Sequence, residues 1–175
     1  RIYSATGSQL PAKQLALNFG APGDRSDEVG QLWLAFPRPK VVGRLEYDFE
    51  VDVKFDGGGG YFNRNHESLP VENTDTQWIY TSAARGITRC RIPLRGKNDG
   101  SAIYTVKLHF SELDANKPDE RVFDVKLQGQ PVEQQLDIVK LAGSAQRTLI
   151  RQFDGIDVHD DLVPPTLAGI EITQQ

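Results

Sequence analysis

Alternation of apolar and polar residues is the dominant pattern along this chain. Over residues 102–111 an apolar side chain falls at every second position, and residues 122–127 alternate in the same way. Because successive side chains of a β-strand point to opposite faces of a sheet, this period of two predicts two half-buried strands. Residues 112–120 between them are mostly polar and contain Pro118, whose nitrogen cannot donate a hydrogen bond. We therefore predict an antiparallel pair joined by a long loop, which is a usual place for binding groups.

The same period of two recurs elsewhere in the chain. It is clearest over residues 45–56, where one face is apolar and the other carries mostly carboxylates. The four glycines at 57–60 are expected to form a turn. Residues 136–142 fit either one helical turn or a strand, and Gly143 ends the segment in both cases. Further strands are expected over residues 15–19, 87–94, 148–158 and 168–173.

Helical periodicity is scarce by comparison. The 16 glycines and 10 prolines are spread along the chain and divide it into many short segments. Short strands separated by turn residues are typical of sandwiches, so we predict a single all-β sandwich with mostly antiparallel strands.

Composition and charge narrow the class of protein. The 175 residues suit one domain, with an N-terminal tail or edge segment over residues 1–13 and a sandwich over residues 14–175. The formal net charge is −4 and no basic stripe is present, which argues against a nucleic acid partner. No apolar run is long enough for membrane insertion as a helix. Because the chain begins with Arg1 and contains no methionine, we expect a processed chain or a piece of a longer protein.

Reactive residues form no recognisable catalytic pattern. His66, His109 and His159 are widely spaced, and the chain has no HExxH, CxxC or G-x-S-x-G motif. His109 falls on the polar face of its predicted strand, where a cross-strand partner is the better interpretation. The single cysteine, Cys90, falls on an apolar face and is expected in the core. We therefore expect a protein that is not an enzyme and that carries no cofactor.

Three acidic residues are the weak candidates for a metal site. Asp24, Asp27 and Glu28 lie close together in a predicted loop, and carboxylate oxygens can hold calcium. Their spacing does not fit an EF-hand loop. A solvated acidic loop is the favoured interpretation, and a structural calcium ion is the alternative.

Aromatic and polar residues gather directly after the glycine run. Tyr61 and Phe62 are followed by Asn63, Arg64 and, two positions further, His66. Aromatic rings stack on the C–H faces of sugars, while amide, guanidinium and imidazole groups hydrogen-bond the hydroxyls. The set fits sugar recognition. It fits equally a loop in which one aromatic side chain fills the core and the polar residues brace the backbone.

Several segments of the chain together resemble the malectin-like carbohydrate-binding domain. The motifs that carry the resemblance read HFSEL over residues 109–113, RVFDVKLQGQ over 121–130 and LDIVKLAG over 136–143. Asn18-Phe19-Gly20 is similar to the Asn-x-Gly of that family's first strand, and residues 167–172 are similar to its closing strand. The resemblance spans residues 15–173 with gaps.

This resemblance implies a jelly-roll sandwich of the galactose-binding-like kind. The expected function is that of a non-catalytic module, which attaches a larger multidomain protein to a glycan. The expected partners are an oligosaccharide and the other domains of a parent protein, and the expected location is extracytoplasmic or secreted. Glu112 belongs to the strand signature of the family, and we expect it to hydrogen-bond a loop rather than to catalyse.

The resemblance also suggests one ligand residue. Tyr80 lies six residues before Gly86, as a binding aromatic of the family does, and Trp78 would share its face if the segment is extended. Asp114 and Ala115 stand where the family has loop aromatics, and Val163 stands near the position of a late acid. The family's glucose-disaccharide specificity is therefore not carried over. Asp114 is kept as a candidate for binding a different glycan.

The alternative hypothesis is a protein-interaction or assembly domain whose sugar site has lapsed. It depends on the apolar segment at residues 31–37, which contains Trp33 and Phe36. Such a segment is more often core or a domain contact than a sugar platform. If both side chains are exposed, a partner surface gains support.

Overall fold

The structure is a computed structural model that describes residues 10–38, 51–65, 67–96, 98–114, 117–158, 162–163 and 166–175, with the backbone alone at 162–163 and 166–167. Within these residues the chain forms twelve strands and two short helices. They are β1 (Gln14–Phe19), β2 (Arg25–Ser26), β3 (Leu32–Phe36), β4 (Asp52–Asn63), α1 (Gln77–Tyr80), β5 (Ser82–Arg91), β6 (Ala102–Ser111), β7 (Val122–Leu127), β8 (Gln130–Asp137), α2 (Ile138–Ala142), β9 (Thr148–Val158), β10 (Leu162–Val163), β11 (Thr166–Leu167) and β12 (Gly169–Gln174).

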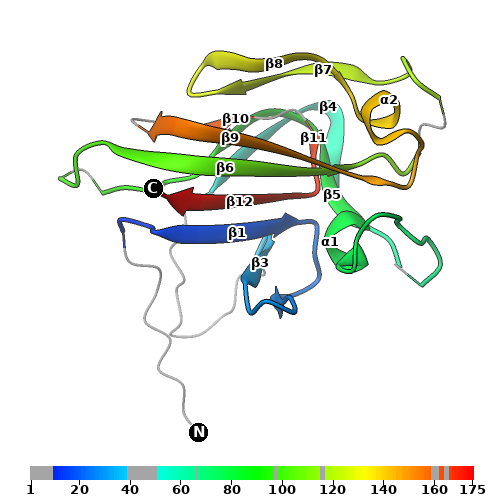
Figure 1. The fold of residues 1–175 in the computed structure, drawn as a ribbon, viewed down its shortest axis with the longest axis horizontal. Helices are drawn as coiled ribbons and strands as arrows, with labels where there is room; N and C mark the ends of the chain where they lie inside the picture. Colours follow the sequence, from blue (N-terminus) through cyan, green and yellow to red (C-terminus); the bar gives the residue numbers. More distant parts are fainter. Residues whose placement is uncertain are drawn as a thin grey trace, which may run out of the picture.

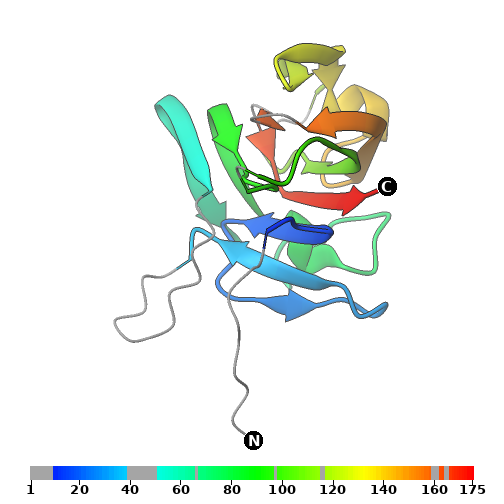
Figure 2. The same cartoon turned by 90° about the vertical axis from the view of Figure 1, so that its left-hand side faces the viewer.

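The strands form one large sheet and two small ones. The large sheet has the order β2-β3-β1-β12-β6-β9, and the small sheets have the orders β10-β7-β8 and β11-β5-β4. All strand pairs are antiparallel except β1 with β3, which is parallel. The two small sheets face one side of the large sheet (Figures 1 and 2). This arrangement confirms the predicted all-β sandwich.

The main apolar cluster, here called the sandwich core, fills the space between these layers. The apolar positions of β1, β6 and β12 point into it, which is the face that their period of two predicts. The fully buried members are Leu15, Leu17, Phe19, Ala84, Ile87, Cys90, Ile92, Leu94, Tyr104, Val106, Leu108, Phe110, Val125, Leu127, Leu136, Ile138, Val158, Ile170 and Ile172. The predicted strands at 102–111 and 122–127 are confirmed with the same bounds.

A second apolar cluster, here called the end cluster, covers part of the opposite face of the large sheet. Its buried members are Ala16, Trp33, Val71, Ile79, Tyr80, Ala83, Leu113 and Ala168. Asn18, Gly169 and His109 form one row across β1, β12 and β6. Trp33 and Ile79 lie directly over Gly169 in that row. In the next row along the same face, Ala16 still belongs to the end cluster, while Glu171 of β12 is partly exposed.

Helix α1 is fixed to the large sheet by side chains that bind its backbone carbonyls. Asn18 of β1 donates to the carbonyl of Trp78 at 3.4 Å, and Ser111 of β6 donates to the carbonyl of Tyr80 at 2.7 Å. The Oδ1 atom of Asn18 accepts from Ser82 at 2.9 Å. These bonds give a physical reason for the Asn-Phe-Gly sequence at the end of β1. Gly20 takes a left-handed φ of 75° there and passes close to the carbonyl of Phe62.

Two predictions about the glycine-rich region need revision. The expected turn at residues 57–60 is wrong, because β4 continues through the glycines to Asn63. The pairing of β4 with β5 shifts between Phe55 and Gly60, so the glycines form an irregular bulge opposite Gly86. Of the predicted strand at 45–56, residues 45–50 lie outside the described residues and 52–56 belong to β4.

The segment at residues 136–142 combines both alternatives. Strand β8 continues to Asp137, and α2 then occupies residues 138–142. Asp137 caps α2 by accepting from the backbone N–H of Lys140 at 3.0 Å. Gly143 ends the helix with a left-handed φ of 90°, as the sequence predicts.

We expect Gly169→Ala to lower the free energy of unfolding by about 1–3 kcal/mol, the typical cost of overpacking a filled core. An added Cβ would lie 2.8 Å from Cζ3 of Trp33, 3.1 Å from the carbonyl oxygen of Leu17 and 3.3 Å from Cγ2 of Ile79. Urea unfolding measures the change. Gly57→Ala is the matched control, because a Cβ there meets nothing within 4 Å. Equal stability losses in the two variants would contradict the packing of Trp33 against β12.

Candidate functional site

Three loop or strand residues far apart in the sequence meet at one end of the sandwich. Asp114, which follows β6, accepts ion-paired hydrogen bonds from Arg64, which follows β4, and from Arg85 of β5. The three side chains are 30 %, 41 % and 36 % exposed. A single carboxylate therefore clamps two guanidinium groups at the protein surface.

Both guanidinium groups lie close to one aromatic ring. The Cζ atom of Arg64 is 5.7 Å from the centroid of the Phe62 ring, and that of Arg85 is 5.1 Å away. These distances fall within the range of cation–π attraction. Phe62 is half-buried and packs against the end cluster. We call Phe62, Arg64, Arg85 and Asp114 the Asp114 cluster.

Backbone contacts fix the strand end that carries this cluster. Asn63 donates to the carbonyl of Gly20 at 3.3 Å, and the backbone N–H of Arg64 donates to the carbonyl of Thr81 at 2.9 Å. These bonds tie the end of β4 to the turn after β1 and to the start of β5. Asn63 thus braces the backbone rather than reaching outward.

The buried carboxylate of Glu112 fixes the backbone at Asp114. Glu112 is 2 % exposed, and its Oε1 atom accepts from the backbone N–H of Asp114 at 3.0 Å. Its Oε2 atom pairs with the guanidinium of Arg121, across the loop. The expectation that Glu112 hydrogen-bonds a loop is confirmed.

Asp114 is ionised at neutral pH. Partial burial acts to raise its pKa, but hydrogen bonds from Arg85 and Arg64, together with their charges, outweigh burial and hold the pKa of Asp114 below its usual 3.8. One carboxylate and two guanidinium groups leave the cluster with a net charge of +1. The site therefore offers several N–H donors and one strong acceptor in a small area.

The structure places Tyr80 in the interior, which corrects its assignment as an exposed sugar platform. Its side chain is 2 % exposed, and its hydroxyl is 2.8 Å from Nδ1 of His109. Burial raises the pKa of Tyr80 above its usual range, so the phenol keeps its proton. The other nitrogen of His109, Nε2, lies 2.9 Å from Glu171 on the neighbouring strand, which confirms the cross-strand interpretation of His109.

Trp78 and Tyr80 do not share a face, because residues 77–80 form one helical turn rather than an extended segment. Residues two apart in a helix point in nearly opposite directions. Tyr80 points into the end cluster, whereas Trp78 is half-buried at its edge. The guanidinium of Arg25 lies 4.9 Å from the Trp78 ring centroid, and Trp33 meets that ring edge-on at 6.3 Å.

Tyr61 faces away from the Asp114 cluster. It neighbours Phe62 in β4, so the two rings lie on opposite faces, and Tyr61 packs edge-on against Phe55 at 5.0 Å and Phe36 at 5.9 Å. This half-buried ring belongs to the sandwich core side of the sheet. His66 lies outside the described residues. Among the described members of the gathered set, Phe62 and Arg64 are the two that meet in the site.

The apolar segment that supported a partner surface is mostly interior. Trp33 is 2 % exposed in the end cluster, and Phe36 is half-buried against Phe19. The core interpretation of Trp33 is confirmed. Cys90 is also buried, and burial raises the pKa of its thiol to about 12, which leaves it unreactive at neutral pH.

Two of the three acidic residues proposed as weak calcium ligands, Asp24 and Asp27, bind protein donors, and Glu28 is exposed in a turn. Asp24 pairs with Arg38 at 2.5 Å and accepts from the backbone N–H of Ala35 at 2.9 Å. Asp27 accepts from the backbone N–H groups of Val29 and Gln31. Among the residues that the structure describes, no three His, Cys, Asp or Glu side chains are grouped so that they could hold a metal ion.

Arg85 is the member of the site that sequence reasoning missed. It stands in a run of small residues before Gly86, and nothing in its spacing distinguishes it from the other arginines of β5. Its role depends on the pairing of β5 with Gly60 of β4 and on the course of the chain after β6. Its contact with Asp114 could be predicted only from the pairing of β4 with β5 in the folded protein.

The chain is thus a β-sandwich with a polar, partly aromatic cluster at one end. The malectin domain profile matches residues 38–174, and the chain belongs to this family. Membership supports a carbohydrate-binding or extracellular ligand-binding domain. A search of curated proteins finds no match. No helix in the described part of the chain is long and apolar enough to cross a membrane.

Solved structures share the fold at low identity. A β-glucuronidase from Bacteroides uniformis superposes with a TM-score of 0.62 at 19 % identity, over 93 % of this chain and 18 % of that chain. The extracellular domain of ANXUR1 from Arabidopsis thaliana gives 0.62 at 14 %, over 91 % and 47 %. A complex of the plant peptide RALF23 with FER and LLG2 gives 0.61 at 18 %, over 91 % and 48 %. The chain spans less than half of each of these proteins, and the likeness establishes the fold alone.

We expect Asp114→Asn to lower the free energy of unfolding by at most about 1 kcal/mol at neutral pH, because the pairs it breaks are partly exposed. The folded pKa lies below the usual value of 3.8, so this contribution is present above that pH and is lost as pH falls through the folded pKa. Urea unfolding from pH 7 to pH 2 should therefore show the two proteins converging in acid. Glu28→Gln, in an exposed turn, is the control. A wild-type advantage that stays constant down to pH 2 would refute the ion-pair origin.

Proposed function

We propose that this domain is a non-catalytic carbohydrate-binding module that binds a glycan at the Asp114 cluster. The observation that supports this most directly is the convergence of Phe62, Arg64, Arg85 and Asp114 from three separate segments at one end of the sandwich. Membership in the malectin family supports the same class of ligand. The module would hold a larger extracytoplasmic or secreted protein on its glycan.

The chemistry of the cluster suits hydroxyl groups. A sugar hydroxyl can donate to Asp114 while its neighbour accepts from a guanidinium, because each hydroxyl both donates and accepts. The exposed edge of Phe62 and the flat guanidinium groups give apolar and planar contact for the ring. With a single aromatic ring, we expect weak binding in a shallow, wet groove.

A non-catalytic role agrees with how the carboxylates are used. Glycoside hydrolysis needs two carboxyl groups held about 5–10 Å apart across a bond, with one of them free to exchange a proton. Asp114 and the nearby Glu112 are only two positions apart in the chain, and both are engaged by arginines. The pKa of Asp114 is lowered, which is the opposite of what a general acid needs.

A peptide or protein ligand is the second candidate. One solved structure with the same fold is a complex that contains the plant peptide RALF23. The chain of that complex that matches is 18 % identical to this chain. The surface expected from Trp33 does not support this candidate, because Trp33 is buried. A peptide would instead have to bind the loops at the Asp114 end.

We expect the 175-residue chain to bind a defined set of structures on a glycan array, and Arg64→Ala to weaken that binding by at least about tenfold. Removing a charged hydrogen-bond donor typically costs this much in affinity. Affinities for the best hits are then measured by calorimetry, and thermal unfolding establishes that each variant is folded.

Arg89→Ala is the matched control. Arg89 is also 41 % exposed and is also paired with one carboxylate, Asp52, but it lies toward the other end of β5. It should leave affinity unchanged. Absence of binding across plant, algal, bacterial and animal glycans would overturn the proposal and favour the peptide candidate. Equal losses in Arg64→Ala and Arg89→Ala would remove the site from the Asp114 cluster. Tyr80→Ala is a poor probe, because it removes a buried side chain.

A further inference from the structure

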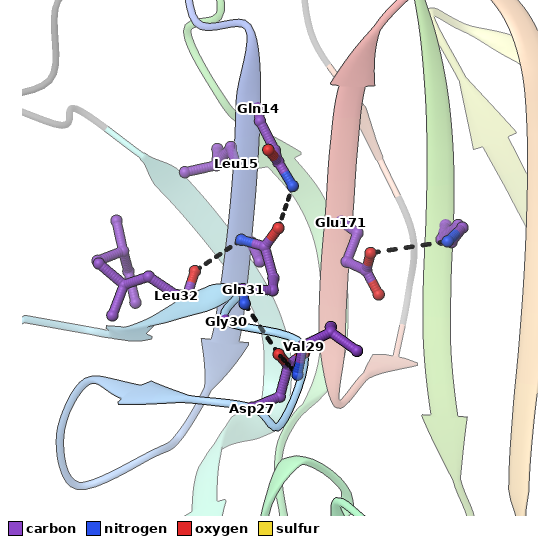
Figure 3. Close-up of a pocket in the computed structure, with 11 residues that line it drawn as sticks. Gln14, Leu15, Asp27, Val29, Gly30, Gln31, Leu32 and Glu171 are labelled. Carbon is purple, nitrogen blue, oxygen red and sulfur yellow. Dashed lines mark hydrogen bonds and ion pairs between the residues drawn. The ribbon is translucent and has the colours of Figure 1, made fainter.

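A hollow lies on the outer face of the large sheet, away from the Asp114 cluster. It has a volume of about 680 Å³, within the range typical of small-molecule sites. Its floor comes from β1, one wall comes from β3 and the turn before it, and the other wall comes from Glu171 of β12 and Lys107 of β6. Figure 3 shows Gln14 and Gln31 in contact on one side and Glu171 reaching from β12 toward β6 on the other.

The hollow exists because the end cluster covers only part of this face. Trp33 and Ile79 cover the row of Asn18, Gly169 and His109. The next row holds Ala16, Glu171 and Lys107 in register across the same three strands. The hollow begins at that row, so Glu171 stands on the border between the buried interior and the open face.

Glu171 is held in a fixed position from the buried side. Its Oε1 atom lies 2.9 Å from Nε2 of His109, which is 5 % exposed, and its Oε2 atom lies 3.7 Å from Nζ of Lys107. The hydroxyl of Tyr80 holds the other ring nitrogen of His109 at 2.8 Å. The interaction with His109 outweighs burial and keeps the pKa of Glu171 below its usual value. The hollow therefore contains a charged acceptor whose orientation is set before any ligand binds.

Amide and apolar groups complete the lining. Gln14 donates to the side chain of Gln31, and Gln31 in turn donates to the carbonyl of Leu32 at 2.9 Å. Leu32 is 49 % exposed and Val29 is 90 % exposed, so the outer rim is aliphatic. The lining thus combines donors, acceptors and apolar contact.

We propose that this hollow is a second binding site, independent of the Asp114 cluster, for a neutral saccharide or similar polyol. Vicinal hydroxyls match a lining in which amide, carboxylate and ammonium groups alternate, and the C–H faces of a ring match the side chains of Leu32 and Val29. The carboxylates of Asp27 and Glu171 outnumber the single ammonium of Lys107, which disfavours an anionic ligand.

Strand addition by a peptide does not fit this place. The floor strand β1 pairs with β3 and β12, and β12 and β6 are likewise paired on both sides. Because β1 pairs with β3 only over residues 17–19, an incoming strand would find at most residues 14–16 of β1 open on that side. Side-chain recognition of a compact ligand remains the use that this geometry supports.

The test is a nitrogen–proton NMR titration of the 175-residue chain with four neutral trisaccharides: maltotriose, cellotriose, mannotriose and galactotriose. We expect at least one to shift the amides of Gln31, Lys107 and Glu171. Gln31→Ala and Lys107→Ala should each weaken this binding about three- to tenfold, the usual effect of losing one hydrogen bond. Gln152→Ala, in the same row as Lys107 but outside the hollow, should leave it unchanged. Arg64→Ala should also leave it unchanged.

Each other outcome counts against the proposal. Shifts confined to the amides of Arg85 and Asp114 would assign all sugar binding to the Asp114 cluster. They would overturn the second site, while the proposed function would stand. No shift with any trisaccharide would overturn the second site. The glycan array would still test separately whether the Asp114 cluster binds a glycan. Shifts of Gln31 that grow with protein concentration and without sugar would assign the hollow to a contact between two copies of the chain.

Discussion

The buried contact between Tyr80 and His109 holds α1, which has a single turn, on the outer face of the six-stranded sheet. The two ring nitrogens of His109 lie close to two oxygen groups, Nδ1 at 2.8 Å from the Tyr80 hydroxyl and Nε2 at 2.9 Å from Glu171. Trp33 meets the imidazole edge-on at 5.1 Å. Leaving any of these polar groups buried without a partner would cost about 1–3 kcal/mol, so the group is stable only as a whole.

This contact also decides which surfaces are left for ligands. Tyr80 packs in the end cluster over the row of His109, and in the next row Glu171 is partly exposed. On the other side of α1, Ser82 and Ala83 pair with Asn63 and Phe62, which places the Phe62 ring beside Arg85. The Asp114 cluster and the hollow therefore both depend on the way α1 packs against the large sheet. The two sites have different charge, because one is rich in arginine and the other has more carboxylate than ammonium.

Sequence patterns predicted the strands well where one face of the strand enters the sandwich core. The strand at 102–111 is such a case, because its apolar positions all enter the sandwich core. The pattern failed at residues 57–60, where glycines suggest a turn but the strand continues as a bulge, since a glycine can pass close to Arg85 and Gly86 where a larger residue cannot. It failed at residues 77–80 because four residues are too few to show a helical period. Three of the four residues of the candidate site were predicted, namely Phe62, Arg64 and Asp114. Arg85 enters only through strand register.

The Asp114 cluster contains one aromatic ring and three charged groups, and this composition has a chemical consequence. A site built on stacked rings gains affinity from apolar contact, which depends little on salt or acid. In the Asp114 cluster the donors are already bound to Asp114, so a ligand must exchange with an existing ion pair instead of filling an empty pocket. Exposed ion pairs contribute at most about 1 kcal/mol, which makes this exchange inexpensive but also makes the net gain small. We therefore expect the proposed site to bind more weakly than one built on stacked rings and to be more polar and more sensitive to ionic strength. Its specificity would follow from its own loop residues rather than from the shared architecture.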